Sequence, residues 1–81
     1  MSQLRIMEKI IECLLNHGKM KLDELRNCVI RNAKIYVTNF EFLTLIYRLA
    51  RLGYIEIHIR EYSNYRNRIR KIERIIELKQ Q

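Results

Sequence analysis

Apolar and polar residues follow two different periods along this chain, and the change from one to the other falls at Gly53. Intervals of three and four residues are typical of an amphipathic helix, and the first segment has them at Leu4, Met7, Ile10, Ile11, Leu14 and Leu15. Ser2 is a suitable N-cap, and residues 16–18 supply the stop. A very short strand is expected at residues 19–21, followed by a second helix from about Leu22 to Asn32.

Local sequence signals mark both the start and the end of the expected third helix. Thr38 is followed three residues later by Glu41, a capping-box pattern in which the hydroxyl accepts from an early backbone N–H and the carboxylate reaches back. Gly53 can take the left-handed conformation that ends a helix. Residues 54–60 then alternate with period two, which predicts a strand. The core side of the helix is expected to hold Phe42, Leu45, Ile46, Leu49 and Leu52.

The last quarter of the chain supports two interpretations. Residues 62–65 predict a turn, and a returning strand from about Tyr65 to Ile69 would complete a β-hairpin. From Ile69 the apolar spacing becomes helical, so we expect a final helix from about Arg70 to Lys79. The alternative is a longer second strand that reaches Ile72. A terminal helix would carry more apolar residues than one small core needs, so we expect a dimerisation stripe of Ile69, Ile72, Ile75 and Ile76.

Size and charge narrow the class of protein. A chain of 81 residues without repeats or a linker predicts one domain. The net charge of +7 favours a polyanionic partner. No apolar run approaches the roughly 20 residues that a spanning helix needs, and no signal peptide precedes the fold. We therefore expect an intracellular, cytoplasmic protein with no membrane partner.

The two cysteines, Cys13 and Cys28, fall within the expected helices and near their apolar faces. We expect them to serve packing. One alternative is a disulfide between them or across a dimer. Another is a zinc site with His17 and His58, since Cys13 and His17 are four residues apart, but no C-x-x-C pair supports it. No metal, cofactor or small-molecule ligand is expected.

The order helix, short strand, helix, helix, strand, strand resembles the winged-helix (winged helix-turn-helix) DNA-binding family. The pattern Ile46-x-x-Leu49-x-x-x-Gly53-Tyr54-Ile55 is similar to the family's junction between recognition helix and wing. The resemblance covers about residues 4–70 of a single domain, 1–81, and implies a mainly helical α+β fold with a β-hairpin wing. Residues 70–80 would add the possible C-terminal dimerisation helix. Small size, many Ile and Arg residues and the absence of Pro resemble winged-helix proteins of archaeal viruses and plasmids and suit a thermophilic source.

The resemblance implies that the third helix lies in the DNA major groove, where base edges present distinct donors and acceptors. Arg48 would bind guanine through two hydrogen bonds, Asn39 would bind adenine or a phosphate, and Thr44 would touch a thymine methyl. The alternative for each side chain is a solvated helix face. The recognition set comprises Thr38, Asn39, Thr44, Tyr47, Arg48 and Arg51.

The hairpin is expected to hold the DNA backbone or the minor groove. Arg66, Arg68 and Arg70 alternate, so a strand would place them in one row, which suits phosphates or a narrow minor groove. Tyr62 and Tyr65 would hydrogen-bond phosphate oxygens. The alternative is an edge strand made repulsive to prevent aggregation. The wing set comprises Arg60, Tyr62, Tyr65, Arg66, Arg68 and Arg70.

An enzyme is not expected, because the chain has no P-loop, no Gly-rich dinucleotide turn, no Ser-His-Asp set and one Asp. RNA binding is less favoured, since no aromatic pair sits mid-strand as a stacking platform. We predict a sequence-specific, double-stranded DNA-binding protein, a transcription regulator that acts as a homodimer on successive major grooves. The alternative is a protein-interaction module on the same scaffold.

Overall fold

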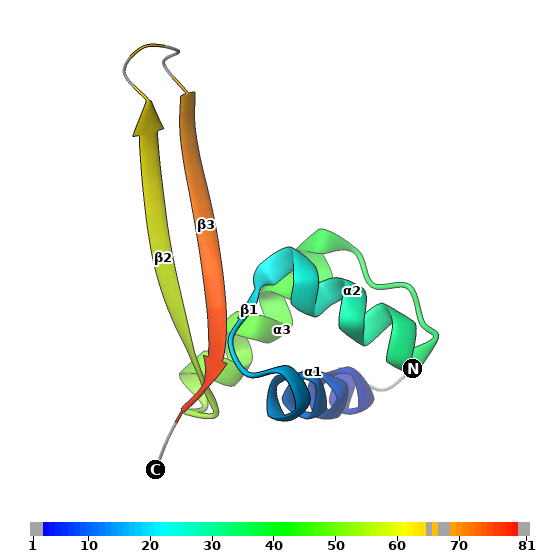
Figure 1. Cartoon of the computed structure of the whole chain (residues 1–81). Helices are drawn as coiled ribbons and strands as arrows, with labels where there is room; N and C mark the ends of the chain where they lie inside the picture. The colour runs from blue at the N-terminus through cyan, green and yellow to red at the C-terminus, as the bar shows by residue number, and fades with distance from the viewer. Residues whose placement is uncertain (1–2, 65, 67–68, 80–81) are drawn as a thin grey trace.

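The structure, a computed structural model, describes residues 3–64, 66 and 69–79. Three helices and a three-stranded antiparallel sheet make a mainly helical α+β fold that is compatible with a winged-helix topology. Figure 1 shows the helices gathered into one body, from which a long β-hairpin rises. The elements are α1 (Gln3–His17), β1 (Met20–Lys21), α2 (Leu22–Ala33), α3 (Asn39–Arg51), β2 (Ile55–Asn64) and β3 (Ile69–Leu78).

The ends of α2 and α3 follow local sequence signals. The Thr38 hydroxyl accepts a hydrogen bond from the Glu41 backbone N–H at 3.1 Å, as the capping pattern predicts. The Glu24 carboxylate accepts from the Lys21 backbone N–H at the start of α2, also at 3.1 Å. Gly53 has a φ of 90°, a conformation that side chains with a Cβ rarely adopt. This residue turns the chain from the end of α3 directly into β2.

One core lies between the three helices and the base of the sheet. The helices bury residues three or four positions apart, and β2 and β3 each add one buried isoleucine, Ile55 and Ile76. Val37, in the link between α2 and α3, is also buried. Leu52 is not part of this core: it follows the last turn of α3 and is 60% exposed, so its expected place is wrong. The core comprises Ile6, Ile10, Cys13, Leu14, Leu25, Cys28, Val29, Val37, Phe42, Leu45, Ile46, Leu49, Ile55 and Ile76.

The C-terminal helix is wrong, because residues 69–78 form the strand β3. This strand is the middle of the sheet, with the order β1-β3-β2. It pairs with β2 from Ile55↔Leu78 to Asn64↔Ile69 and with β1 through Met20↔Ile76. Backbone groups of its base are thus paired on both sides, and its β-branched isoleucines suit a strand. Long-range pairing overrides the helix-like spacing, and the strand also extends past the alternative end at Ile72.

The tip of the hairpin also lies later in the chain than predicted. β2 continues through Asn64, so the turn expected at residues 62–65 and the strand expected from Tyr65 to Ile69 are wrong. Of the expected wing residues, Tyr65 and Arg68 lie outside the described part of the chain. Arg66 lies in the turn, and Arg70 lies in β3.

Directly paired residues of β2 and β3 share a face of the hairpin, which gives the ribbon two distinct sides. The inner face packs on the helices at its base, where Ile55 and Ile76 are buried and Ile57 and Leu78 join the core. Farther out, Ile59 and Ile72 on this face are 62% and 55% exposed. The inner face comprises Ile55, Ile57, Ile59, Glu61 and Ser63 with Arg70, Ile72, Arg74, Ile76 and Leu78. The outer half of the ribbon therefore extends beyond the core.

The isoleucine stripe expected for dimerisation does not form. Ile76 is fully buried in the core, whereas its neighbour Ile75 points to the outer face. Ile72 is largely exposed, and the side chain of Ile69 is outside what the structure describes. No helix among the described residues has both the length and the apolar character needed to cross a membrane.

Candidate nucleic-acid interface

The polar side of α3 is open to solvent, as the helical period predicts. The expected residues Thr44, Tyr47, Arg48 and Arg51 line one hollow of about 340 Å³ on this side. The Thr44 hydroxyl donates to the Phe40 backbone carbonyl at 2.9 Å. This bond uses the hydroxyl proton, and the methyl group of Thr44 remains suited to a thymine contact.

The two residues at the start of α3 have different positions in the site. The Thr38 hydroxyl is engaged with the Glu41 N–H, which gives Thr38 a structural role at the helix start. Asn39 is the first residue of α3 and is exposed. Its place at the helix N-terminus suits contact with a base edge or a phosphate.

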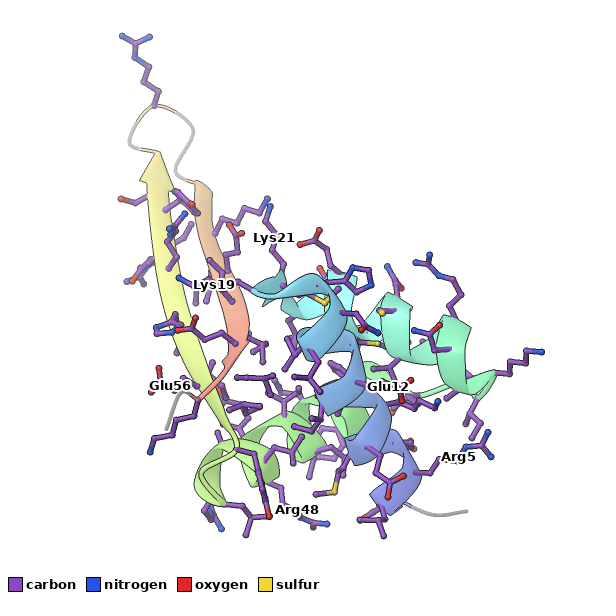
Figure 2. The ribbon with its side chains drawn as sticks, turned by 60° about the horizontal axis from the view of Figure 1, so that its bottom comes forward. Arg5, Glu12, Lys19, Lys21, Arg48 and Glu56 are labelled. Carbon is purple, nitrogen blue, oxygen red and sulfur yellow. The ribbon has the colours of Figure 1, made fainter. Side chains whose placement is uncertain are left out.

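Two contacts connect the exposed side of α3 to other elements. The Arg48 Nη1 donates to the Gln3 Oε1 at 2.8 Å, which ties α3 to the start of α1. The Arg74 Nε donates to the Tyr47 hydroxyl at 3.4 Å. Because Arg74 belongs to the inner face of the hairpin, this second contact joins the helix and the ribbon into one surface. Figure 2 shows Arg48 beneath the helical body, away from the ribbon tip.

The three expected wing residues that lie in the described strands are divided between the two faces of the hairpin. Arg60 and Tyr62 lie on the outer face, where the Arg60 Nη1 donates to the Tyr62 hydroxyl at 3.2 Å. This hydrogen bond raises the pKa of Arg60. Arg70 lies on the inner face and pairs with Glu61. A single row of Arg66, Arg68 and Arg70 is therefore wrong, because β3 begins only at Ile69.

Sequence reasoning missed the contact of Arg74 with the exposed side of α3, and it missed the exposure of Phe40. Arg74 falls within the expected C-terminal helix, although Arg70, Ile72, Arg74 and Ile76 already follow period two in the sequence. Phe40 lies in the first turn of α3 and is 80% exposed. An exposed aromatic side chain of this kind carries no periodic signal, because its neighbour Phe42 is the buried one.

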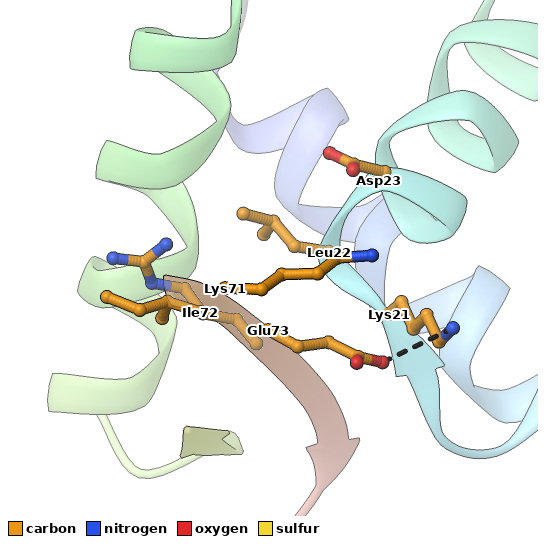
Figure 3. A pocket seen from close by; sticks show the side chains of 7 residues that line it. Lys21, Leu22, Asp23, Lys71, Ile72 and Glu73 are labelled. Atoms are coloured by element: carbon orange, nitrogen blue, oxygen red, sulfur yellow. Dashed lines mark ion pairs between the residues drawn. The ribbon is translucent and has the colours of Figure 1, made fainter. Parts of the chain in front are cut away.

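A second hollow, of about 270 Å³, separates β3 from the start of α2 (Figure 3). Its charges are mixed, since Lys21 Nζ lies 3.3 Å from Glu73 Oε1. Asp23 adds another carboxylate to this hollow. The cations here are partly neutralised, so this hollow is a weaker site for phosphate than the α3 side. Its lining residues are Lys21, Leu22, Asp23, Lys71, Ile72, Glu73 and Arg74.

The base of the outer face carries carboxylates instead of cations. The His58 Nε2 lies 2.5 Å from Glu77 Oε1 and 3.7 Å from Glu56 Oε2. The hydrogen bond with His58 is the main cause of a lowered pKa of Glu77. Lys19 Nζ, 3.6 Å from Glu77, adds to the effect. These pairs link β2 to β3, and β3 to Lys19 just before β1, and they offer little to a polyanion.

The cysteines are buried and free, as expected for packing groups. The Asn32 Nδ2 lies 3.4 Å from the Cys13 Sγ and 3.3 Å from the Cys28 Sγ, so one amide contacts both thiols. Burial raises the pKa of Cys13 to about 11. His58, the fourth residue of the alternative zinc site, bonds Glu77 on the sheet.

No family model, curated protein or solved structure matches this chain.

Proposed function

We propose that this protein binds double-stranded DNA in a sequence-specific manner and regulates transcription, as a protein of the winged-helix type. In this proposal, α3 enters the major groove and the β2–β3 hairpin lies along the backbone or in the minor groove. The observation that carries it is the Arg74–Tyr47 contact, which makes the exposed side of α3 and the inner face of the hairpin continuous. A helix fits the major groove, which is about 12 Å wide.

The charges on this surface suit a duplex. Arg48 and Arg51 stand on α3, and Arg74 and Arg70 follow along the ribbon. To reach a guanine, the Arg48 guanidinium would exchange its hydrogen bond to Gln3 for the base edge. The Arg48–Gln3 hydrogen bond is exposed to solvent, so breaking it for a new hydrogen bond costs little. Arg70 would similarly exchange Glu61 for a phosphate.

Selection from random duplex DNA at physiological salt tests the proposal. Enrichment of one sequence would establish specific binding, and a palindromic sequence would favour two-fold symmetry. Absence of enrichment, together with no binding to duplex DNA at low salt, would refute it.

Three arginine variants then separate reading of bases from contact with phosphates. Arg48→Ala should cost about 1 to 3 kcal/mol on the selected site and much less on random DNA. Arg70→Ala should weaken both equally and flatten the slope of log affinity against log salt by about 0.9 for each phosphate that is no longer neutralised. Arg31→Ala is the matched control, since Arg31 is an exposed arginine on α2 outside this surface.

A further variant tests the tether of Arg48 to α1. Gln3→Ala removes the acceptor for Arg48 without removing the guanidinium. If Arg48 contacts a base, Gln3→Ala should leave specific affinity unchanged or raise it. A loss equal to that of Arg48→Ala would mean that the contact between α1 and α3, and not a base contact, is what matters.

A second candidate function is protein binding, and the exposed aromatic residues favour it. Tyr36, before α3, is 73% exposed, and Phe40, in the first turn of α3, is 80% exposed. Aromatic side chains of this kind are enriched in protein interfaces. If Tyr36 and Phe40 serve protein binding and not DNA binding, Phe40→Ala should leave DNA affinity nearly unchanged.

A further inference from the structure

Phe40 lies on the side of α3 that faces away from the core. Phe40, Thr44, Tyr47 and Arg51 are spaced by four, three and four residues, so helical geometry places them in one row. All four are exposed. Leu49, about two and a half helical turns after Phe40, is buried on the opposite side. Phe40 therefore belongs to the same exposed face as the polar residues proposed to meet DNA.

The segment that leads into α3 is held in place by α2. The Arg26 Nε donates to the Val37 backbone carbonyl at 2.9 Å. The Arg26 guanidinium also lies over the Tyr36 ring, 5.4 Å from its centroid. The Thr38 hydroxyl then caps α3. Phe40 lies in the first turn after this cap, so its position is fixed before any partner binds.

The floor of the DNA major groove holds one kind of group that suits an apolar ring. Base edges there present hydrogen-bond donors and acceptors, whereas thymine adds a 5-methyl group, which phenylalanine can contact. The N-terminal residues of a recognition helix are the ones that contact base edges. If α3 lies in the groove with Thr44 and Arg51 toward the bases, Phe40 also faces them, because the three residues share one row.

We propose that Phe40 is a specificity-determining residue that contacts the 5-methyl group of a thymine in the target duplex. This inference rests on the proposed function and adds one base preference to it, a T·A pair opposite the first turn of α3. The contact removes the ring and the methyl group from water together. Thr44 lies one turn farther along α3, so its own thymine contact would involve a different base pair.

Replacement of thymine by deoxyuridine in the selected duplex tests the contact, because it removes the 5-methyl group and keeps the hydrogen-bonding edge. Each thymine is replaced in turn, and the affinities of the unmodified protein and of Phe40→Ala are measured by fluorescence anisotropy at one salt concentration. At one thymine the unmodified protein should lose about fourfold in affinity for each bound copy, the factor that corresponds to burial of one methyl group. Phe40→Ala should bind the selected site more weakly and should not respond to deoxyuridine at that position.

Two further variants separate the ring from general effects. Phe40→Leu keeps an apolar side chain and should retain part of the response to deoxyuridine. Leu15→Ala is the matched control, since Leu15 is a comparably exposed apolar residue on α1. It should leave the affinity and the response to deoxyuridine unchanged. Circular dichroism should show an unchanged fold in every variant, because both substituted side chains are exposed.

The outcomes distinguish failure of this inference from failure of the proposed function. A selected site without thymine, or one at which deoxyuridine acts equally on the unmodified protein and on Phe40→Ala, overturns the role of Phe40 and leaves specific DNA binding intact. Unchanged DNA affinity of Phe40→Ala also overturns it and favours the protein-binding candidate for this side chain. Absence of specific binding to any duplex refutes the proposed function, and the role of Phe40 is then refuted with it.

Discussion

Ile76 is the residue that joins the hairpin to the helical core, and its truncation should be among the most damaging in the chain. Its side chain is fully buried, and its strand pairs with β1 on one side and β2 on the other. Ile76→Ala removes buried methyl and methylene groups and leaves a cavity, which costs about 2 to 5 kcal/mol. A chain of this length has a total stability of roughly 4 to 12 kcal/mol. We therefore expect a large loss of folded protein.

Ile72→Ala is the matched control, four residues away on the same face of β3. Ile72 is 55% exposed, so less than half of a transfer free energy of about 1.5 to 3 kcal/mol is at stake and no closed cavity forms. Its truncation should cost about 1 kcal/mol or less. Urea unfolding followed by circular dichroism, at one protein concentration for all variants, measures both. If the two substitutions cost the same, the strand assignment and its burial pattern are wrong.

Three further outcomes follow from particular contacts. Because burial raises the pKa of Cys13 to about 11, the unfolded chain releases this thiol proton near pH 9 while the folded chain retains it. Stability should thus fall between about pH 9 and pH 11, and urea unfolding of Cys13→Ala should show a weaker fall. Thr38→Ala should cost about 1 kcal/mol through removal of the N-cap, whereas Thr38→Ser should restore most of it, both by the same assay. Arg60 and Glu73 are direct partners, so a two-residue Asn-Gly turn can replace residues 61–72. The free energy of unfolding of the shortened protein should lie within about 1 kcal/mol of the original, since those of the removed residues that the structure describes are not part of the core. Its DNA affinity should depend less on salt.

The helical body could be predicted from the sequence because its signals are local. Thr38 and Gly53 bound α3 by their own hydrogen-bonding and backbone preferences, and both act at the predicted positions. The helical period likewise brings Thr44, Tyr47, Arg48 and Arg51 to one side, where the structure places them around one hollow.

The C-terminal strand could not be predicted in this way. An interval of four residues, as between Ile72 and Ile76, satisfies the helical period and the strand period alike. Whether residues 69–78 form a helix or a strand depends on pairing with β1, whose residues lie more than 50 positions before their partners in the chain. The Arg74–Tyr47 contact also joins segments far apart in the sequence, so local patterns could not predict the link between the ribbon and α3.

The contacts of the hairpin with the core do not explain its length. Covering the core needs only the base of the ribbon, with Ile55, Ile57, Ile76 and Leu78. An isolated pair of strands is marginally stable in water, so the outer half gains little from being long. Charges of either sign would protect the exposed edges of the ribbon from aggregation. Residues 60–74 nevertheless hold six Lys or Arg and two Glu, a net charge of +4. That excess of one sign supports the proposal that the outer ribbon contacts a polyanion beyond the reach of the helical body.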